Sequence, residues 1–253
     1  MTEAKNPIGA VQTTVEILEV LKRNGEMGIT ELTDHVSVSK GSVHNHLATL
    51  CDNDFVTKTG DRYQLGFRFM DFAHHAKLRV SIYDLVSQEV DNLAAKSGEM
   101  ALYTQAENGM GVCLYRAMGD NAVHTPLYEG HRSELHHTAV GKAILAHMPR
   151  EEVERIIEER GLQSHTPKTI TDPDELFEEL ESIRERGFAF NREETITGLV
   201  GVGAPIQDRH GDVAGAISII GPTSRMDENR FDREIPDMIT RSINIIEINA
   251  TSI

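Results

Sequence analysis

The sequence predicts an α+β chain with two folded parts. A helix-turn-helix followed by a β-hairpin is expected near the N-terminus, and a mixed sheet with helices is expected in the second half. The first prediction rests on residues 37–50 and on two short β-rich runs that follow them. The second rests on strand-like and helical stretches that alternate after Gly98, a pattern typical of a sheet covered by helices. With 253 residues, the chain is long enough for two domains.

Residues 37–50 predict a helix that presents polar side chains near its N-terminus. Val43, Leu47 and Leu50 recur at helical spacing and mark its buried side. A helix that reads DNA places its N-terminal residues against base edges and phosphates. Taken alone, the stretch also fits an ordinary amphipathic helix with a solvated polar face. The residues expected to contact DNA here are the N-cap Ser39 and, within the helix, Lys40, Ser42, His44, Asn45 and His46.

The neighbouring segments favour DNA binding. A first helix is expected over Val11–Asn24, and a second over Glu31–Val36 with Thr30 as its cap. Two β-rich runs around a turn, Phe55–Lys58 and Arg62–Leu65, predict a hairpin, and a hairpin after a recognition helix is the wing of a winged helix. Lys58 and Arg62 flank the hairpin tip, where they can neutralise phosphates. Solvated surface charge is the alternative for these two residues.

Five blocks of sequence carry a family resemblance. They are KGSVHN at residues 40–45, QLG at 64–66, HTAVGKAILA at 137–146, GAPI at 203–206 and AISIIGP at 216–222. On these blocks the chain resembles the IclR family of transcriptional regulators over nearly its whole length. KGSVHN stands where members usually carry Lys-Ser-Thr-Val-His-Arg, so Asn45 replaces the usual Arg. Since Asn prefers adenine and Arg prefers guanine, we expect a half-site richer in A·T pairs.

The resemblance implies three regions: a winged helix-turn-helix over residues 7–66, a helical linker for dimerisation over 67–97, and a GAF-like effector-binding domain over 98–253. The implied function is that of a sequence-specific activator or repressor of catabolic genes, controlled by a small-molecule effector. Its implied partners are double-stranded DNA, the effector, and further copies of the chain in a homodimer or tetramer. A metabolic enzyme with an appended helix-turn-helix module is the alternative.

The connecting segment Phe67–Lys96 has no strand signal and no Pro, which predicts one long helix or two. Its apolar stripe fits either the core of the second domain or a dimer seam, and the resemblance supports the seam. His74 and His75 are adjacent instead of four residues apart, so we interpret them as surface residues and not as a metal pair.

The second half predicts strands and helices in a mixed order. The expected strands are Met100–Gln105, Gly111–Arg116, Ala122–Tyr128, Phe188–Asn191, Leu199–Gln207 and Val213–Ile220. The expected helices are Thr138–Met148, Pro149–Arg160, Pro173–Arg186 and Phe231–Asn249.

The N-terminus of the Thr138 helix is expected to form part of the effector pocket, because free N–H groups there favour a carboxylate or phosphate. Where many members have Cys and Ser, this chain has Gly201 and Ile220, which predicts a larger and less polar pocket. A sugar, a sugar acid, or an aromatic or keto acid is then the expected effector. The alternative is that both residues merely repack the sheet. The residues to which the resemblance assigns effector contacts are Leu135, His136, Thr138, Ala139, Gly201, Val202 and Ser218.

Motif content gives no catalytic or metal site. There is no nucleophile elbow, no phosphate-binding glycine loop and no HExxH, so we expect no enzyme activity and no cofactor. Cys51 and Cys113 form no CxxC pair. His131, His136 and His165 have no ligand spacing, so no metal is expected. No signal peptide or long apolar run is present, and the expected location is the cytoplasm without membrane contact.

The chain is acidic, with 40 Asp and Glu against 25 Lys and Arg. DNA-binding domains are usually basic, but residues 40–79 carry six basic and four acidic residues, so the acid is concentrated elsewhere. Low Lys content and the absence of Trp favour a high-salt cytoplasm; an acidic mesophile protein is the alternative. At about 1 M salt the Debye length is roughly 3 Å, so short-range hydrogen bonds would contribute more to DNA affinity than long-range attraction.

Overall fold

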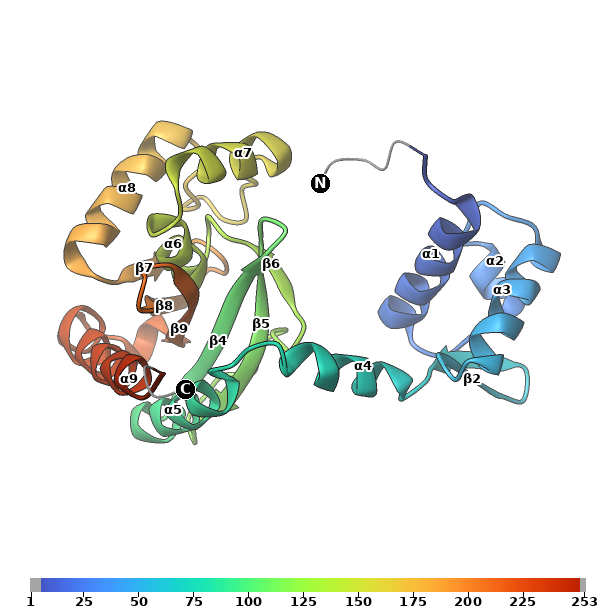
Figure 1. Cartoon of the computed structure of the whole chain (residues 1–253), viewed down its shortest axis with the longest axis horizontal. Helices are drawn as coiled ribbons and strands as arrows, with labels where there is room; N and C mark the ends of the chain where they lie inside the picture. Colours follow the sequence, from blue (N-terminus) through green and yellow to red (C-terminus); the bar gives the residue numbers. More distant parts are fainter. Residues whose placement is uncertain (1–5, 251–253) are drawn as a thin grey trace. The chain divides into compact units, whose positions relative to one another are not determined.

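The computed structural model describes residues 6–250 of the chain. Its contacts divide the chain into two units, Met1–Val80 and Ser81–Ile253 (Figure 1). The expected effector domain extends to residue 253, so its last three residues lie outside the described part. Within residues 6–250, the structure has no helix whose length and apolar character would let it cross a membrane.

The first unit is a three-helix core with a small sheet and one further helix. Its elements are α1 (Gly9–Asn24), β1 (Met27–Gly28), α2 (Ile29–Thr33), α3 (Lys40–Asp52), β2 (Val56–Thr59), β3 (Arg62–Leu65) and α4 (Arg68–Lys77). The sheet order is β1-β3-β2, with antiparallel neighbours. Val43 and Leu47 of α3 are fully buried against Ile17 of α1 and Leu32 of α2. The predicted helix-turn-helix with its hairpin is confirmed.

The start of α2 differs from the prediction. The helix begins at Ile29 with Gly28 as its N-cap, and it ends at Thr33, before the expected end at Val36. The Glu31 side chain reaches back and accepts a hydrogen bond from the Gly28 N–H at 2.7 Å, as in a capping box. Thr30 is therefore inside the helix and not at its cap.

The connecting segment consists of two helices. α4 ends at Lys77, and α5 spans Tyr83–Ser97, with residues 78–82 outside either helix. The apolar side of α5 is core of the second unit, since Val86, Val90 and Leu93 are buried. The other interpretation of the apolar stripe, a dimer seam, stays open only for α4, where no residue is buried. His74 and His75 are exposed, which confirms their interpretation as surface residues.

The second unit contains a six-stranded sheet whose neighbouring strands are all antiparallel. The strands are β4 (Met100–Glu107), β5 (Met110–Met118), β6 (Arg132–Glu134), β7 (Ala189–Arg192), β8 (Leu199–Gln207) and β9 (Val213–Pro222). Their order in the sheet is β6-β5-β4-β9-β8-β7. The strand expected over Ala122–Tyr128 is absent and that prediction is wrong; this segment contains Pro126, which has no N–H for a ladder.

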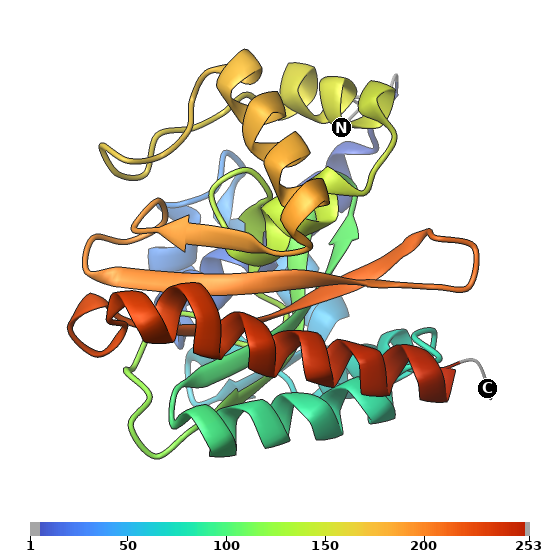
Figure 2. The same ribbon diagram turned by 90° about the vertical axis from the view of Figure 1, so that its left-hand side faces the viewer.

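Helices cover both faces of this sheet. They are α5 together with α6 (Ala139–Ala146), α7 (Arg150–Arg160), α8 (Pro173–Arg186) and α9 (Ile235–Ala250), the last preceded by short turns η1 (Thr223–Arg225) and η2 (Arg230–Glu234). α5 and α9 lie side by side against one face (Figure 2). α6 packs on β8 and β9 from the other face, and α8 packs on α6. The predicted α+β class is confirmed, but the expected mixed sheet is wrong, because every described strand pair of this sheet is antiparallel.

Candidate functional site

The exposed side of α3 begins with a capped N-terminus. The Ser39 hydroxyl accepts a hydrogen bond from the Ser42 N–H at 3.3 Å, as predicted for an N-cap. Lys40 is exposed, and its ammonium donates to the Thr30 hydroxyl at 3.1 Å. His44 and Asn45 are both exposed. The predicted residues of α3 thus include two, His44 and Asn45, whose side chains face solvent near the helix start.

His46 has a different environment from its neighbours. It is half-buried, and its Nδ1 lies 2.8 Å from the Thr14 hydroxyl of α1. The Thr14 hydroxyl donates its own proton to the Ala10 carbonyl, so it accepts from His46 Nδ1–H. This hydrogen bond links the side chains of α3 and α1.

The two cations of the hairpin also differ from each other. Lys58 is exposed, and its Nζ lies 5.4 Å from the centre of the Tyr63 ring. Arg62 Nε lies 2.7 Å from Glu26 Oε1, and Arg62 Nη2 lies 3.4 Å from Glu31 Oε2. The Gly28 N–H and, secondly, Arg62 hold the pKa of Glu31 below its usual value. Arg62 is therefore already paired with two carboxylates, a feature that its sequence neighbourhood does not reveal.

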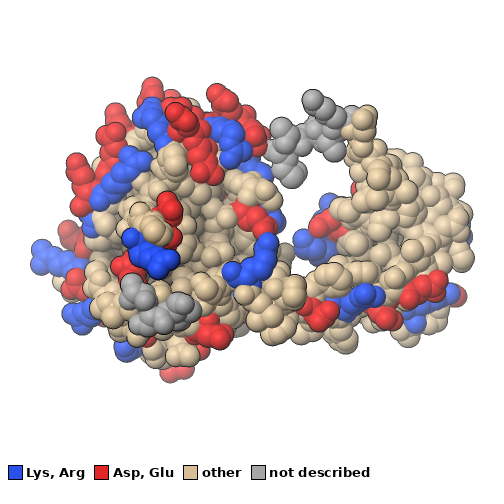
Figure 3. Space-filling view, viewed as in Figure 1, with Lys and Arg blue, Asp and Glu red and all other residues tan. Residues whose placement is uncertain are grey.

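Net negative charge is concentrated on the second unit: residues 1–80 carry nine Lys and Arg against ten Asp and Glu, and residues 81–253 carry sixteen against thirty. Figure 3 shows Asp and Glu interleaved with Lys and Arg over α7 and α8. Ion pairs within α7 join Arg150 to Glu154 and Arg155 to Glu159. In the same view, few charged side chains appear over α2 and α3. The helix predicted to meet DNA is thus not strongly basic.

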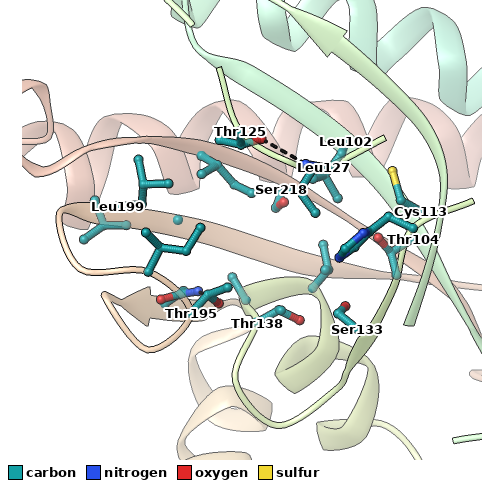
Figure 4. Close-up of a pocket in the computed structure, with 18 of the residues that line it drawn as sticks. Leu102, Thr104, Cys113, Thr125, Leu127, Ser133, Thr138, Thr195, Leu199 and Ser218 are labelled. Carbon is teal, nitrogen blue, oxygen red and sulfur yellow. Dashed lines mark hydrogen bonds between the residues drawn. The ribbon is translucent and has the colours of Figure 1, made fainter. Parts of the chain in front are cut away.

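The second unit contains a cavity of about 110 Å³ on the α6 side of the sheet. Its walls come from β4, β5, β8 and β9, from the start of α6, and from loops on both sides (Figure 4). The described lining residues carry no carboxylate, ammonium or guanidinium group. Six of them carry hydroxyls: Thr104, Thr125, Ser133, Thr138, Thr195 and Ser218.

Two features of this cavity favour a polar ligand. Ser218 is 1 % exposed, and within the described part of the chain its hydroxyl has no hydrogen-bond partner. Thr138 is the N-cap of α6, and its hydroxyl accepts from the Gly141 N–H at 3.0 Å. That leaves the N–H groups of Ala139 and Val140, in the first turn, without an intrahelical partner. The close approach of α6 to β8 depends on Gly203, where a Cβ would lie 2.9 Å from Val140 N.

The structure brings four of the seven predicted effector residues to the cavity: Thr138, Ala139, Gly201 and Ser218. Ile220 also lines it, beside Gly201. The other three predicted residues lie elsewhere. Leu135 is part of the hydrophobic core, His136 hydrogen-bonds the Gln163 carbonyl at 3.0 Å, and Val202 is buried one position along β8, where alternation points it to the opposite face.

Sequence reasoning missed several lining residues from other elements. Thr104 is on β4, Leu127 is in the loop where a strand had been expected, and Asn191 and Thr195 lie at and after the end of β7. The Asn191 amide donates to the Thr195 hydroxyl at 2.7 Å. These residues become neighbours only when the chain has folded, so no local sequence pattern predicts that they line one cavity.

A buried ion pair supports the loop that carries Asn191 and Thr195. Lys142 of α6 is 2 % exposed, and its Nζ lies 2.7 Å from one oxygen of Glu194 and 2.8 Å from the other. The Glu194 N–H donates to the Asn191 side-chain oxygen at 2.8 Å. Burial raises the pKa of Glu194, although Lys142 opposes the shift. The pair therefore ties α6 to the loop across the cavity.

Comparison with known proteins decides the family. The model described as "Bacterial transcriptional regulator IclR C-terminal" matches residues 74–245, and the "IclR helix-turn-helix domain" matches residues 10–60. The chain belongs to the IclR family. It is therefore a DNA-binding transcriptional regulator, from a family whose members are typically not enzymes.

Individual IclR-family proteins resemble the chain over most of its length. A Halobacterium salinarum protein named "Probable HTH-type transcriptional regulator ArcR" is 36 % identical over 95 % of this chain and 93 % of its own length. The Escherichia coli regulator KdgR is 28 % identical over 94 % of this chain and 91 % of its own. The crystal structure of the Thermotoga maritima IclR covers 94 % of this chain and 97 % of its own, with a TM-score of 0.79 and 27 % identity.

Proposed function

We propose that this regulator controls catabolic genes in response to a hydroxyl-bearing carboxylic acid, such as a sugar acid, which binds in the cavity of the second unit. The observation that carries the proposal is the buried Ser218 hydroxyl, which has no partner within the described residues and lines the same cavity as the first turn of α6. An unpartnered buried hydroxyl costs about 1–3 kcal/mol, so a ligand that hydrogen-bonds it recovers that free energy.

The carboxylate of such a ligand has a place at the N-terminus of α6. The N–H groups of Ala139 and Val140 point out of the helix start, where the helix dipole favours negative charge. The described lining residues include no Lys or Arg, so the helix N-terminus is the proposed place for the carboxylate. The imidazole of His131, which also lines the cavity, is a further polar group for the ligand.

The hydroxyls of the ligand have partners on the remaining walls. Six hydroxyl side chains and the Asn191 amide line the cavity, and Leu102, Leu127 and Ile220 cover the carbon skeleton. A sugar acid uses most of these groups. An aromatic or keto acid that places no polar group at Ser218 would leave that hydroxyl unpaired, which costs affinity.

The test is a thermal-shift screen with matched ligands. Sugar acids, the corresponding neutral sugars, keto acids and aromatic acids are compared on the full chain, since a ligand raises the melting temperature according to its concentration over its Kd. We expect a sugar acid to stabilise the parent most and its neutral counterpart less. Ser218→Ala should weaken the effect, and Ala139→Trp should abolish it. Equal stabilisation of Ala139→Trp and the parent would contradict the site, and a best hit without a carboxylate would contradict the ligand class.

The same hit tests the alternative of an enzyme. We propose that the chain binds its effector without converting it. Incubation of the hit with the protein, followed by mass spectrometry of the ligand, should return it unchanged. More than one molecule of product per protein chain would favour the enzyme instead.

For DNA, we propose that His44 and Asn45 of α3 read base edges, that Lys40 and Lys58 contact phosphates, and that Arg62 holds the hairpin. The support is exposure: His44, Asn45 and Lys58 face solvent, whereas Arg62 is paired with Glu26 and Glu31. Ser39 and Ser42 shape the helix start, and their backbone groups lie near the phosphate side of a recognition helix.

We also propose that the chain works as a homodimer or tetramer. Phe67, the N-cap of α4, is 87 % exposed, and Met70 within α4 is 69 % exposed, so both form an apolar surface that a second copy would cover. Two winged helices would then meet two half-sites. Sedimentation should give a dimer or larger, and Met70→Glu should shift it toward monomer. A monomeric parent at micromolar concentration would contradict this assembly.

A further inference from the structure

Three side chains of the second unit converge outside the effector cavity. Glu134 of β6, His137 before α6 and His165 between α7 and α8 each offer one ligand atom, and these atoms lie within 4.8 Å of one another. Glu134 Oε2 is 2.7 Å from His165 Nε2 and 3.7 Å from His137 Nε2. None of the three belongs to the cavity lining. The side of the cluster at His165 reaches solvent, since that side chain is 37 % exposed.

The hydrogen bonds of Thr195 fix which nitrogen of His137 carries the proton. The Thr195 hydroxyl donates to the His137 carbonyl at 2.7 Å, so it acts as an acceptor toward the His137 ring. His137 Nδ1, at 3.1 Å from this hydroxyl, must then be the donor. The neutral ring therefore presents the lone pair of Nε2 to Glu134 and His165.

We propose that Glu134, His137 and His165 bind a divalent transition-metal ion of the zinc type. Two imidazole nitrogens and one carboxylate form a donor set that suits zinc, with the fourth position open to water. Zinc lies about 2.0–2.2 Å from each ligand atom, so the ligand atoms of a tetrahedral site are roughly 3.3–3.6 Å apart. Around an ion, the 2.7 Å contact of Glu134 with His165 would open by less than about 1 Å, and the 3.7 Å contact of Glu134 with His137 already fits. The Thr195 hydrogen bond supplies the orienting partner that a metal-bound His normally has.

Two of the three proposed ligands are adjacent in sequence to residues that line the effector cavity. Glu134 follows Ser133 and His137 precedes Thr138, and both Ser133 and Thr138 line the effector cavity. His165 belongs to a different loop, between α7 and α8. A bound ion would therefore fasten that loop to the back of the cavity wall. If the cavity binds the proposed effector, the ion should tighten that binding; the metal site itself does not depend on it.

The test measures zinc binding directly. The full chain is stripped with a chelator and dialysed, and Zn²⁺ binding is followed by competition with a chromogenic chelator and by calorimetry. Variants His165→Ala and Glu134→Gln remove one ligand each from partly exposed positions. His124→Ala, an exposed His of the same unit outside the cluster, is the matched control. Melting curves of the metal-free proteins show that each variant is folded.

We expect one zinc ion per chain, at least about tenfold weaker binding in each ligand variant, and unchanged binding in His124→Ala. Zinc should raise the melting temperature of the parent more than that of either variant, and Mg²⁺ or Ca²⁺ should not displace it. Zinc binding that is absent, or that is equal in the parent and both ligand variants, would overturn the proposal. Either outcome would show that Glu134, His137 and His165 form a hydrogen-bonded cluster that binds no zinc.

Discussion

The exposed side of α3 and the cavity of the second unit both offer neutral hydrogen-bonding groups, but they differ in burial. Asn45 is exposed, whereas Ser218 is 1 % exposed and without a partner among the described residues. A group that is already desolvated gains free energy when a ligand reaches it, whereas an exposed group exchanges water for the ligand at little net gain. The cavity is therefore suited to high affinity for its ligand, and the exposed side of α3 to discrimination between DNA sequences.

The two surfaces also share a low content of unpaired charge. The described cavity lining has no Lys, Arg, Asp or Glu, and near α3 the guanidinium of Arg62 is paired with Glu26 and Glu31. For a chain with a formal net charge of −15, attraction to phosphate has to come from a few local cations.

The largest expected effect comes from breaking the ion pair that supports the cavity. Lys142→Met leaves Glu194 buried without its cation, and we expect a loss of about 3–5 kcal/mol in unfolding free energy. Arg155→Ala, in an exposed ion pair of α7, should cost less than about 1 kcal/mol. Urea unfolding of both variants measures the difference. Equal losses would show that Lys142 and Glu194 do not hold the cavity loop.

The next effect concerns the approach of α6 to β8. Gly203→Ala places a methyl group 2.9 Å from backbone atoms of Ala139 and Val140, whereas Gly201→Ala meets its nearest atom at 3.2 Å. We expect Gly203→Ala to cost about 1–3 kcal/mol and to weaken effector binding by moving the helix N-terminus. Gly201→Ala should be milder in both respects. Calorimetric titration of the two variants with the effector measures this. If Gly203→Ala bound the effector as tightly as the parent does, the proposed position of the binding cavity would be wrong.

A smaller effect is expected on the exposed side. Asn45→Ala should remove the preference for adenine at one base pair, which corresponds to about 1–3 kcal/mol of binding free energy. Lys58→Ala should instead weaken all sequences alike. Selection of binding sites from a random library separates the two behaviours. An unchanged selected profile in Asn45→Ala would show that this residue does not read bases.

Local signals explain why some elements could be predicted to the residue. α8 begins after Asp172, whose carboxylate accepts from the N–H groups of Asp174 and Glu175, and it ends at Gly187 in the left-handed conformation. These capping residues are adjacent to the helix they delimit, as Ser39 is to α3. The DNA-facing stretch is likewise a single run of sequence, so its exposed residues could be predicted together.

The cavity could be predicted only in part, because its walls come from distant segments. Thr104 and Ser218 meet through the pairing of β4 with β9, a register that periodicity alone does not specify. The segment 122–128 has strand-like composition but finds no partner strand in the described structure, and it lines the cavity instead. The pairing of Arg62 with Glu26 and Glu31 likewise appears only after β3 pairs with β1.

The central claim is that α3 and the hairpin recognise DNA with few free cations, and the salt dependence of DNA binding tests it most directly. The Kd for an operator fragment is measured across a salt series for the parent, Lys58→Ala and Arg62→Ala. Each phosphate contact contributes about 0.9 to the slope of log affinity against log salt. We predict that Lys58→Ala lowers the slope by about one per protomer and that Arg62→Ala leaves it unchanged, because Arg62 is already neutralised by Glu26 and Glu31. A slope that falls as much in Arg62→Ala as in Lys58→Ala would contradict the account.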